Sequence, residues 1–171
     1  MNNLSELQIS RKALQQNATK LSVAHAKTFA VIKANAYGHG IDVAVTCLDG
    51  NVDGFAVDDL EELVAVRAIS SKPTLVLGYV ACHQVEEAIR LEGELAIYDV
   101  KRLPEIAKAG DRLKKRPKVH LKIDALLGRQ GLLPDDLREF LARLQNFPQI
   151  DLVAAYSHFG NIEDTTDLSH A

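Results

Sequence analysis

The sequence is poor in cysteine, has no long hydrophobic run and carries little net charge. Its two cysteines, Cys47 and Cys82, lie apart from each other and from any histidine pattern, so we expect two reduced thiols in a cytosolic protein and no metal site. No apolar run approaches the roughly 20 residues of a membrane span, and no secretory leader is recognisable. The net charge of −3 and the pI near 6.1 give no reason to expect nucleic acid or an anionic membrane as a partner.

What the sequence does have is a regular alternation of apolar runs of strand length with amphipathic stretches of helix length. Its 171 residues, 47% hydrophobic and 25% charged, suffice for one globular domain with a substantial core. The apolar runs predict six strands, at residues 28–32, 54–57, 74–77, 95–98, 119–123 and 150–156. We expect helices at residues 11–24, 41–48, 84–91 and 134–144, one ending near residue 106, and one that begins with Asp58 and Glu61 as a capping box.

This alternation predicts an α/β fold with a parallel sheet built from βαβ units, which an open doubly wound sheet and a (β/α)8 barrel both satisfy. A dinucleotide-binding open sheet has a glycine-rich turn of defined pattern after its first strand, and residues 33–40 do not show it. A functional rim spread over many strand ends is typical of the barrel. We therefore expect a TIM-type barrel, incomplete because about six of its eight strands are present. The polar residues at the strand ends are Lys33, Asp58, Asp99, Asp124, Ser157 and His158.

Lys33 directly follows the first apolar strand. A lysine there would be partly desolvated, and its amine can form a Schiff base with a carbonyl compound. Position alone favours a plainer interpretation, a lysine that marks where a strand meets solvent, because lysines often flank strands. The residues that follow Lys33 change this weighting.

Residues 31–40, VIKANAYGHG, closely resemble the attachment signature for pyridoxal 5'-phosphate (PLP) in alanine racemases. Amino-acid decarboxylases of the same fold type share only its first part. The resemblance continues in order along the chain at residues 75–78, 119–124, 128–131 and 156–159. It implies that residues 1–171 are the N-terminal, PLP-binding barrel domain of an alanine racemase, which interconverts L-alanine and D-alanine.

The resemblance also implies roles for particular side chains around the cofactor. Lys33 carries PLP and acts as one of two catalytic bases. Tyr37 contacts the cofactor phosphate, Leu77 lies near the cofactor, and His158 lies against its pyridine ring. Without the resemblance, His158 would be interpreted as a satisfied core histidine.

Arg129 and Lys122 form a second group in the family. Arg129 hydrogen-bonds the phenolic oxygen of the cofactor and helps to hold the substrate carboxylate, tasks that suit its fixed charge and planar fork. Lys122 supports Arg129, and the matching lysine is carbamylated in some family members, which turns a cation into an anion. Residues 125–127 are Ala-Leu-Leu where the family usually has Thr-Gly-Met, and the loss of a glycine constrains the loop that carries Arg129.

Racemisation needs two bases, because a proton leaves one face of the α carbon and returns to the other. In the family the second base is a tyrosine from the C-terminal β-domain of the partner subunit. None of the four tyrosines here, Tyr37, Tyr79, Tyr98 and Tyr156, has a matching context. We expect the β-domain and the last two barrel strands, with the main phosphate anchors, to be missing from this chain.

Three functions remain open at this point. The first is an alanine racemase, a cytoplasmic homodimer that makes D-alanine for peptidoglycan. The second is a PLP-dependent racemase of serine or of a basic amino acid. The third is a truncated remnant that binds PLP, or another copy of itself, without turnover. In every case we expect two unpaired strand edges to make the isolated chain poorly stable or self-associating.

Overall fold

Six parallel strands form one sheet in the order β1-β2-β3-β4-β5-β6, in a computed structural model that describes residues 7–125 and 127–160. Each strand pairs in parallel with the one before it. The order of a doubly wound sheet reverses at a switch point, whereas barrel strands follow one another in sequence. The barrel-type prediction is therefore confirmed. The strands are β1 (Phe29–Val31), β2 (Gly54–Val57), β3 (Thr74–Val76), β4 (Glu94–Ile97), β5 (Lys118–Lys122) and β6 (Asp151–Tyr156).

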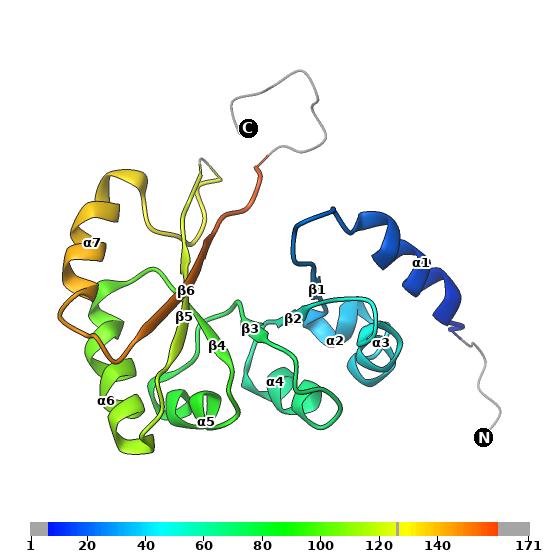
Figure 1. Cartoon of the computed structure of the whole chain (residues 1–171), viewed down its shortest axis with the longest axis horizontal. Helices are drawn as coiled ribbons and strands as arrows, with labels where there is room; N and C mark the ends of the chain where they lie inside the picture. The colour runs from blue at the N-terminus through cyan, green and yellow to red at the C-terminus, as the bar shows by residue number, and fades with distance from the viewer. Residues whose placement is uncertain (1–6, 126, 161–171) are drawn as a thin grey trace.

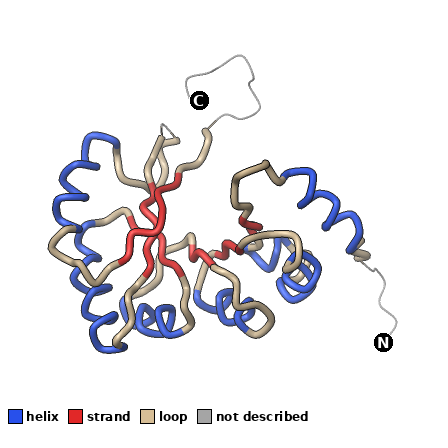
Figure 2. The backbone as a smooth tube through the Cα atoms, viewed as in Figure 1, coloured by secondary structure: helices blue, strands red, loops and turns tan. Residues whose placement is uncertain are grey.

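The strands form an arc, with α4, α5, α6 and α7 along its convex side (Figure 1). Figure 2 shows the same arrangement, with the strands surrounded by helices on the outside and an open concave side. Parallel crossovers of one hand place their helices on the same face. The helices are α1 (Arg11–Leu21), α2 (Lys33–Tyr37), α3 (Ile41–Leu48), α4 (Leu60–Arg67), α5 (Val85–Arg90), α6 (Leu103–Leu113) and α7 (Leu137–Leu144), with short 3-10 turns η1 (Cys82–Gln84), η2 (Val100–Arg102) and η3 (Pro134–Asp136).

Several helix boundaries differ from those expected. The helix expected to end near residue 106 is α6, which continues to Leu113. The first helix ends at Leu21 rather than near residue 24, because Ser22 is extended and both its N–H and its hydroxyl donate to the carbonyl of Ala18. The cap of α4 is Asp59 and not Asp58: the Asp59 carboxylate accepts from the N–H of Glu62 at 2.9 Å. None of the described helices is long and apolar enough to cross a membrane.

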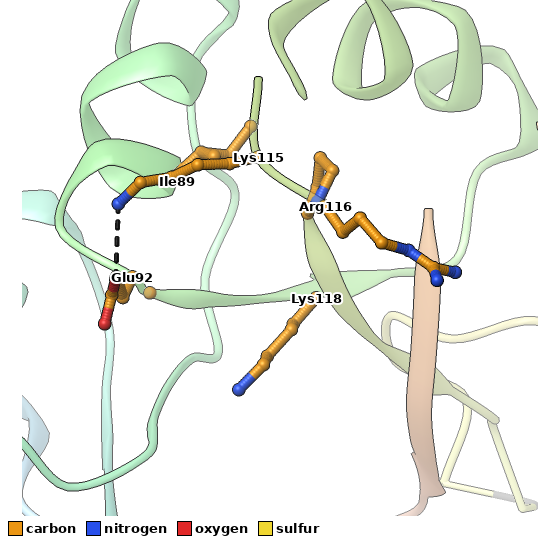
Figure 3. A pocket seen from close by; sticks show the side chains of 7 residues that line it. Ile89, Glu92, Lys115, Arg116 and Lys118 are labelled. Atoms are coloured by element: carbon orange, nitrogen blue, oxygen red, sulfur yellow. Dashed lines mark hydrogen bonds and ion pairs between the residues drawn. The ribbon is translucent and has the colours of Figure 1, made fainter. Parts of the chain in front are cut away.

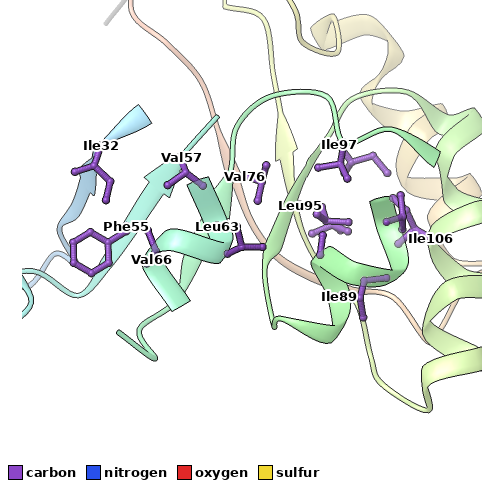
Figure 4. Close-up of a cluster of buried hydrophobic side chains, with 14 of the residues drawn as sticks. Ile32, Phe55, Val57, Leu63, Val66, Val76, Ile89, Leu95, Ile97 and Ile106 are labelled. Carbon is purple, nitrogen blue, oxygen red and sulfur yellow. The ribbon is translucent and has the colours of Figure 1, made fainter. Parts of the chain in front are cut away.

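The hydrophobic core lies between the sheet and the helices on its convex side. Figure 4 shows Leu95 and Ile97 of β4 facing Ile106 of α6, while Phe55 of β2 lies beside Val66 of α4. Because alternate strand residues point to opposite faces, one face of each strand supplies this core. Each fully buried side chain of this size contributes about 1.5–3 kcal/mol to folding.

The opposite face of β4 and β5 carries buried polar side chains. His120 shares this face with Ala96, its register partner, and its Nε2 lies 2.6 Å from Glu94 Oε2. Lys118 Nζ lies 3.7 Å from the other oxygen of Glu94, which is only 3% exposed. The concave side of the sheet therefore holds ionisable groups that are paired with one another.

The outer strands β1 and β6 each pair with one neighbour within the described sheet. Val31 of β1 and Val153 of β6 are each 45% exposed. A largely apolar cavity of about 320 Å³ lies beside β1 and is lined by α1 and α3. These two edges are where the curved sheet stays open.

Candidate active site

Lys33 and Asp58 lie together where the first strands end. Lys33 begins α2 and is separated from the end of β1 by one residue, and Asp58 directly follows β2. The strand pairing continues to this level, since the N–H of Ile32 donates to Ala56 O at 2.8 Å. Lys33 Nζ is 3.9 Å from Asp58 Oδ1, and the Lys33 side chain is 39% exposed. The rim thus presents a primary amine that is accessible to a small molecule and lies beside a carboxylate.

The backbone after Lys33 turns in the left-handed sense. Ala34, Asn35 and Ala36 have φ between 51° and 53°, and Tyr37 has φ 52°. For a residue with a Cβ this conformation costs roughly 1–2 kcal/mol, so it persists only where the surroundings over-determine it. The element labelled α2 is therefore a single left-handed turn that reverses the chain beside the lysine.

Asn35 is the centre of the bonds that hold this turn. Its carbonyl accepts from the N–H of Gly40 at 3.0 Å, and its side-chain oxygen accepts from the N–H of Ile41 at 3.0 Å. Its own N–H donates to Glu62 Oε1 at 2.9 Å. Gly38 and Gly40, at φ 89° and 91°, continue the positive-φ backbone, which explains why glycines occupy both positions of the motif.

A second group lies where β5 and β6 end. Lys122 is 4% exposed, and its Nζ lies 5.0 Å from the centre of the Tyr156 ring. Burial, together with the positive charge of Arg129, lowers the pKa of the Lys122 amine, against a smaller opposite effect of Asp124. Burial likewise raises the pKa of Tyr156 to about 12. In this part of the rim, the desolvated amine of Lys122 therefore lies beside the phenol of Tyr156, which stays protonated.

Arg129 is exposed on the loop between β5 and η3. Asp124 anchors this loop, because its Oδ1 accepts from the N–H of Leu127 at 3.0 Å and of Gly128 at 3.2 Å. Gln130 Nε2 donates to the carbonyl of Leu77 at 3.2 Å and so ties the loop to the end of β3. Hydrogen bonds to Asp124 and from Gln130 therefore hold the loop that carries Arg129.

The predicted site residues differ in how closely they are tied to the rest of the rim. Leu77 contacts Gln130, the neighbour of Arg129. Tyr37 is 62% exposed and borders the cavity beside β1. His158 follows β6 and is exposed, contrary to a core position. Sequence reasoning missed Glu62, although its spacing from Asp59 is that of a capping box one residue later than expected.

A cavity of about 270 Å³ with several basic residues lies at the opposite end of the strands (Figure 3). Lys115 points to Glu92 and lies 3.3 Å from its Oε1, whereas Arg116 donates to the carbonyl of Pro148 at 3.2 Å. Lys118 is paired with the buried Glu94. Lys115 and Lys118 are already paired with carboxylates, and this end of a barrel serves stability, so we place the candidate site at the other rim.

The sequential parallel sheet, with a lysine amine and polar side chains at its carboxyl rim, defines an α/β barrel domain built around a rim site. No group of three or more metal-binding side chains occurs within residues 7–125 and 127–160. The family model for the N-terminal domain of alanine racemase matches residues 9–171, and the chain belongs to this family.

Relatives and solved structures agree with this assignment. The chain is 34% identical to alanine racemase 2 of Caldanaerobacter subterraneus over 148 residues, 85% of this chain and 38% of that protein. It is 33% identical to an alanine racemase of Mannheimia succiniciproducens over 93% of this chain and 45% of that protein. An alanine racemase structure from Clostridium difficile superposes with a TM-score of 0.85 at 26% identity, over 93% of this chain and 42% of that one. The structure of a biosynthetic alanine racemase from Pseudomonas aeruginosa superposes with a TM-score of 0.78 at 33% identity, over 94% of this chain and 44% of that one. The chain therefore spans about two fifths of the length of these relatives.

Proposed function

We propose that this chain is the cofactor-binding barrel portion of a PLP-dependent alanine racemase and that Lys33 carries the cofactor. The observation that carries the proposal is the accessible Lys33 amine at the carboxyl rim of the sheet, in a chain of the alanine racemase N-terminal domain family. Relatives that are alanine racemases by name support alanine as the substrate. In this proposal residues 1–171 belong to the barrel domain, and a C-terminal β-domain completes the enzyme.

The residues at the rim fit an aldehyde cofactor with a phosphate group. An aldehyde requires a primary amine that it can reach, and the 39% exposed Lys33 side chain provides one. The exposed phenol of Tyr37 is free to meet the phosphate. Arg129 supplies a fixed positive charge for the phenolic oxygen of the cofactor. Leu77 and His158 border the pyridine ring of the cofactor in the family arrangement.

PLP, once bound, supplies an electron sink for negative charge at the α carbon of an amino acid. Lys33 then removes or returns the proton on one face of that carbon. Arg129 orients the substrate by its carboxylate, so that the α C–H bond faces the base. The base for the opposite face comes from the β-domain of the partner subunit in a homodimer.

We assign Lys122 the supporting role beside Arg129. Its buried amine, with a lowered pKa, is suited to react with carbon dioxide, because the neutral form is the nucleophile. The nitrogen lone pair forms the N–C bond and one proton leaves to solvent, which gives a carbamate that can accept hydrogen bonds from Arg129. In the cell, the enzyme would be cytoplasmic and would supply D-alanine for peptidoglycan.

The test is a titration of the purified chain with PLP, followed through the visible absorbance of the bound cofactor. Borohydride reduction then fixes a pyridoxyl label on the lysine that carried it, and peptide mass spectrometry locates the label. We expect the band and the label at Lys33, and neither in Lys33→Ala. Lys108→Ala, which removes an exposed lysine on α6, is the matched control and should behave as wild type. Labelling scattered over surface lysines, unchanged in Lys33→Ala, would overturn the proposal.

A further inference from the structure

Glu62 joins two separate segments of the rim through one carboxylate. It lies in the first turn of α4. Its Oε1 accepts from the N–H of Asn35 at 2.9 Å, and its Oε2 accepts from the N–H of Asp58 at 2.8 Å. Hydrogen bonds to an ionised acceptor are the stronger kind. One side chain therefore ties the left-handed turn to the end of β2.

Both of these backbone groups belong to the immediate surroundings of Lys33. Asn35 lies two residues after the lysine, at the centre of the left-handed turn. Asp58 carries the carboxylate that lies 3.9 Å from Lys33 Nζ. Glu62 thus fixes the backbone that follows the lysine and also the residue that the amine faces.

The turn depends on such a contact from outside. Four successive residues with a Cβ are held at positive φ, and a conformation of this kind survives where the surroundings over-determine it. The other bonds at Asn35 come from Gly38, Gly40 and Ile41, which are in the same segment. Glu62 links the left-handed turn itself to the next βα unit.

We propose that Glu62 is a positioning residue for Lys33: its carboxylate holds the left-handed turn and Asp58 in the arrangement that presents the amine to the cofactor. The effect of Glu62 on the backbone does not depend on a cofactor. Its consequence for the cofactor rests on the function proposed above.

Three variants distinguish the loss of the bridge between Asn35 and Asp58 from the loss of a negative charge in α4. Glu62→Gln keeps the shape and one carbonyl oxygen, but its NH2 group is a donor and cannot accept from the second N–H. Glu62→Asp keeps the charge at the start of α4 and is too short to reach both segments. Glu61→Gln is the matched control, because Glu61 precedes Glu62 in the same turn, is exposed, and loses the same charge.

The first readout is amide hydrogen exchange by mass spectrometry over residues 33–40 and 57–60. We expect exchange about tenfold faster in at least one of these segments for Glu62→Gln and Glu62→Asp. Glu61→Gln should match wild type, and exchange in β4 and β5 should be unchanged in all variants. Equal exchange in wild type and both Glu62 variants would overturn the inference, whether or not the chain binds PLP.

The second readout is the rate of borohydride-fixed pyridoxyl labelling at Lys33, divided by the rate at the exposed Lys108 in the same sample. We expect this ratio to fall about tenfold in both Glu62 variants and to stay at the wild-type value in Glu61→Gln. A general loss of stability would alter both lysines and leave the ratio unchanged. If wild type is labelled at Lys33 and both Glu62 variants are labelled equally well, the positioning role is wrong. If wild type is not labelled at Lys33, the proposed function fails and the exchange experiment alone decides on Glu62.

Discussion

Gly78 shows how closely the strand ends approach one another at the rim. Its N–H donates to the carbonyl of Asp58 at 3.0 Å, and a Cβ at Gly78 would lie 2.4 Å from that same oxygen. Backbone on both sides leaves little room for relaxation. A side chain at this position therefore has to push β2 and β3 apart beside Lys33.

We predict that Gly78→Ala lowers the free energy of unfolding by about 1–3 kcal/mol. Urea unfolding followed by circular dichroism measures this. Gly50→Ala is the control, because a Cβ at that exposed position meets nothing within 4 Å. A Gly78→Ala variant as stable as Gly50→Ala would contradict the packing at the rim.

Glu94 gives the stability a dependence on pH. The hydrogen bond from the His120 side chain lowers the pKa of the Glu94 carboxyl, and this outweighs burial, which acts in the opposite direction. A carboxyl whose pKa is lower in the folded state than its ordinary value of 4.5 stabilises the fold above that pH. The contribution is lost as the pH falls below that value towards the folded-state pKa.

We therefore expect the free energy of unfolding of wild type to decline as the pH falls below about 4.5. In Glu94→Gln the decline should be shallower, because the variant has no proton to take up at this site. Parallel urea titrations between pH 3 and 7 make the comparison, with Glu139→Gln as the control for an exposed, weakly paired carboxylate. Curves of identical slope in wild type and Glu94→Gln would count against the role of the pair.

At the scale of the elements, Arg67 at the end of α4 connects three of them. Its guanidinium donates to the carbonyls of Leu91 and Glu92 after α5 and to those of Ser70 and Lys72 before β3. Burial lowers the pKa of Arg67, yet arginine stays charged in proteins. A single side chain thus fixes where α4, α5 and β3 meet.

Arg67→Lys should destabilise the fold by about 2–4 kcal/mol, because an ammonium cannot replace a planar fork that serves several carbonyls. Thermal and urea unfolding give the measurement. Arg143→Lys, on the exposed face of α7, should change stability little. Similar values for the two variants would show that the Arg67 hydrogen bonds are not needed.

The sequence predicted the elements well where local patterns decide them. All six strands were confirmed, because continuous apolar runs bounded by polar residues are characteristic of a buried parallel sheet. The cap of α4 was misplaced by one residue, since Asp58 and Asp59 are chemically equal candidates and the end of β2 determines which is used. The left-handed turn could not be predicted, because alanine and asparagine do not specify it and Glu62, 27 residues away, helps to hold it.

In the candidate site, too, some features could be predicted from the sequence and others could not. Lys33 was predicted from its position after a strand and from the motif around it, and Lys122 from the resemblance to the family; the roles of both stay predictions. The contact of Glu62 with two segments needs the distance between them, which no pattern in the chain contains. Tyr37 and His158 stay predictions, since both are exposed at the rim and their roles depend on the cofactor.

At the scale of the whole molecule, the open sheet governs how the isolated chain behaves. β1 and β6 each have one unpaired edge within the described residues, and both expose valine side chains. Unpaired, apolar strand edges pair with other chains. The 171-residue chain should therefore self-associate in solution.

Sedimentation velocity over a range of micromolar concentrations tests this, and we expect species larger than the 18.8 kDa monomer. Val153→Lys places a charge on the exposed edge strand β6 and should shift the distribution towards monomer. Val64→Lys, on the exposed face of α4, is the control and should not. A compact monomer at every concentration would refute the expectation.

The order of the strands also bears on synthesis of the chain at the ribosome. Because each strand pairs with the one made just before it, every new βα unit finds its neighbour already present, and no long loop must close first. Among the residues that the structure describes, the hydrogen bonds that hold the Lys33 turn reach no further along the chain than Glu62 of α4, which ends at Arg67. The lysine end of the rim can therefore take its final form co-translationally, before the strands that bear Lys122 and Tyr156 have been translated.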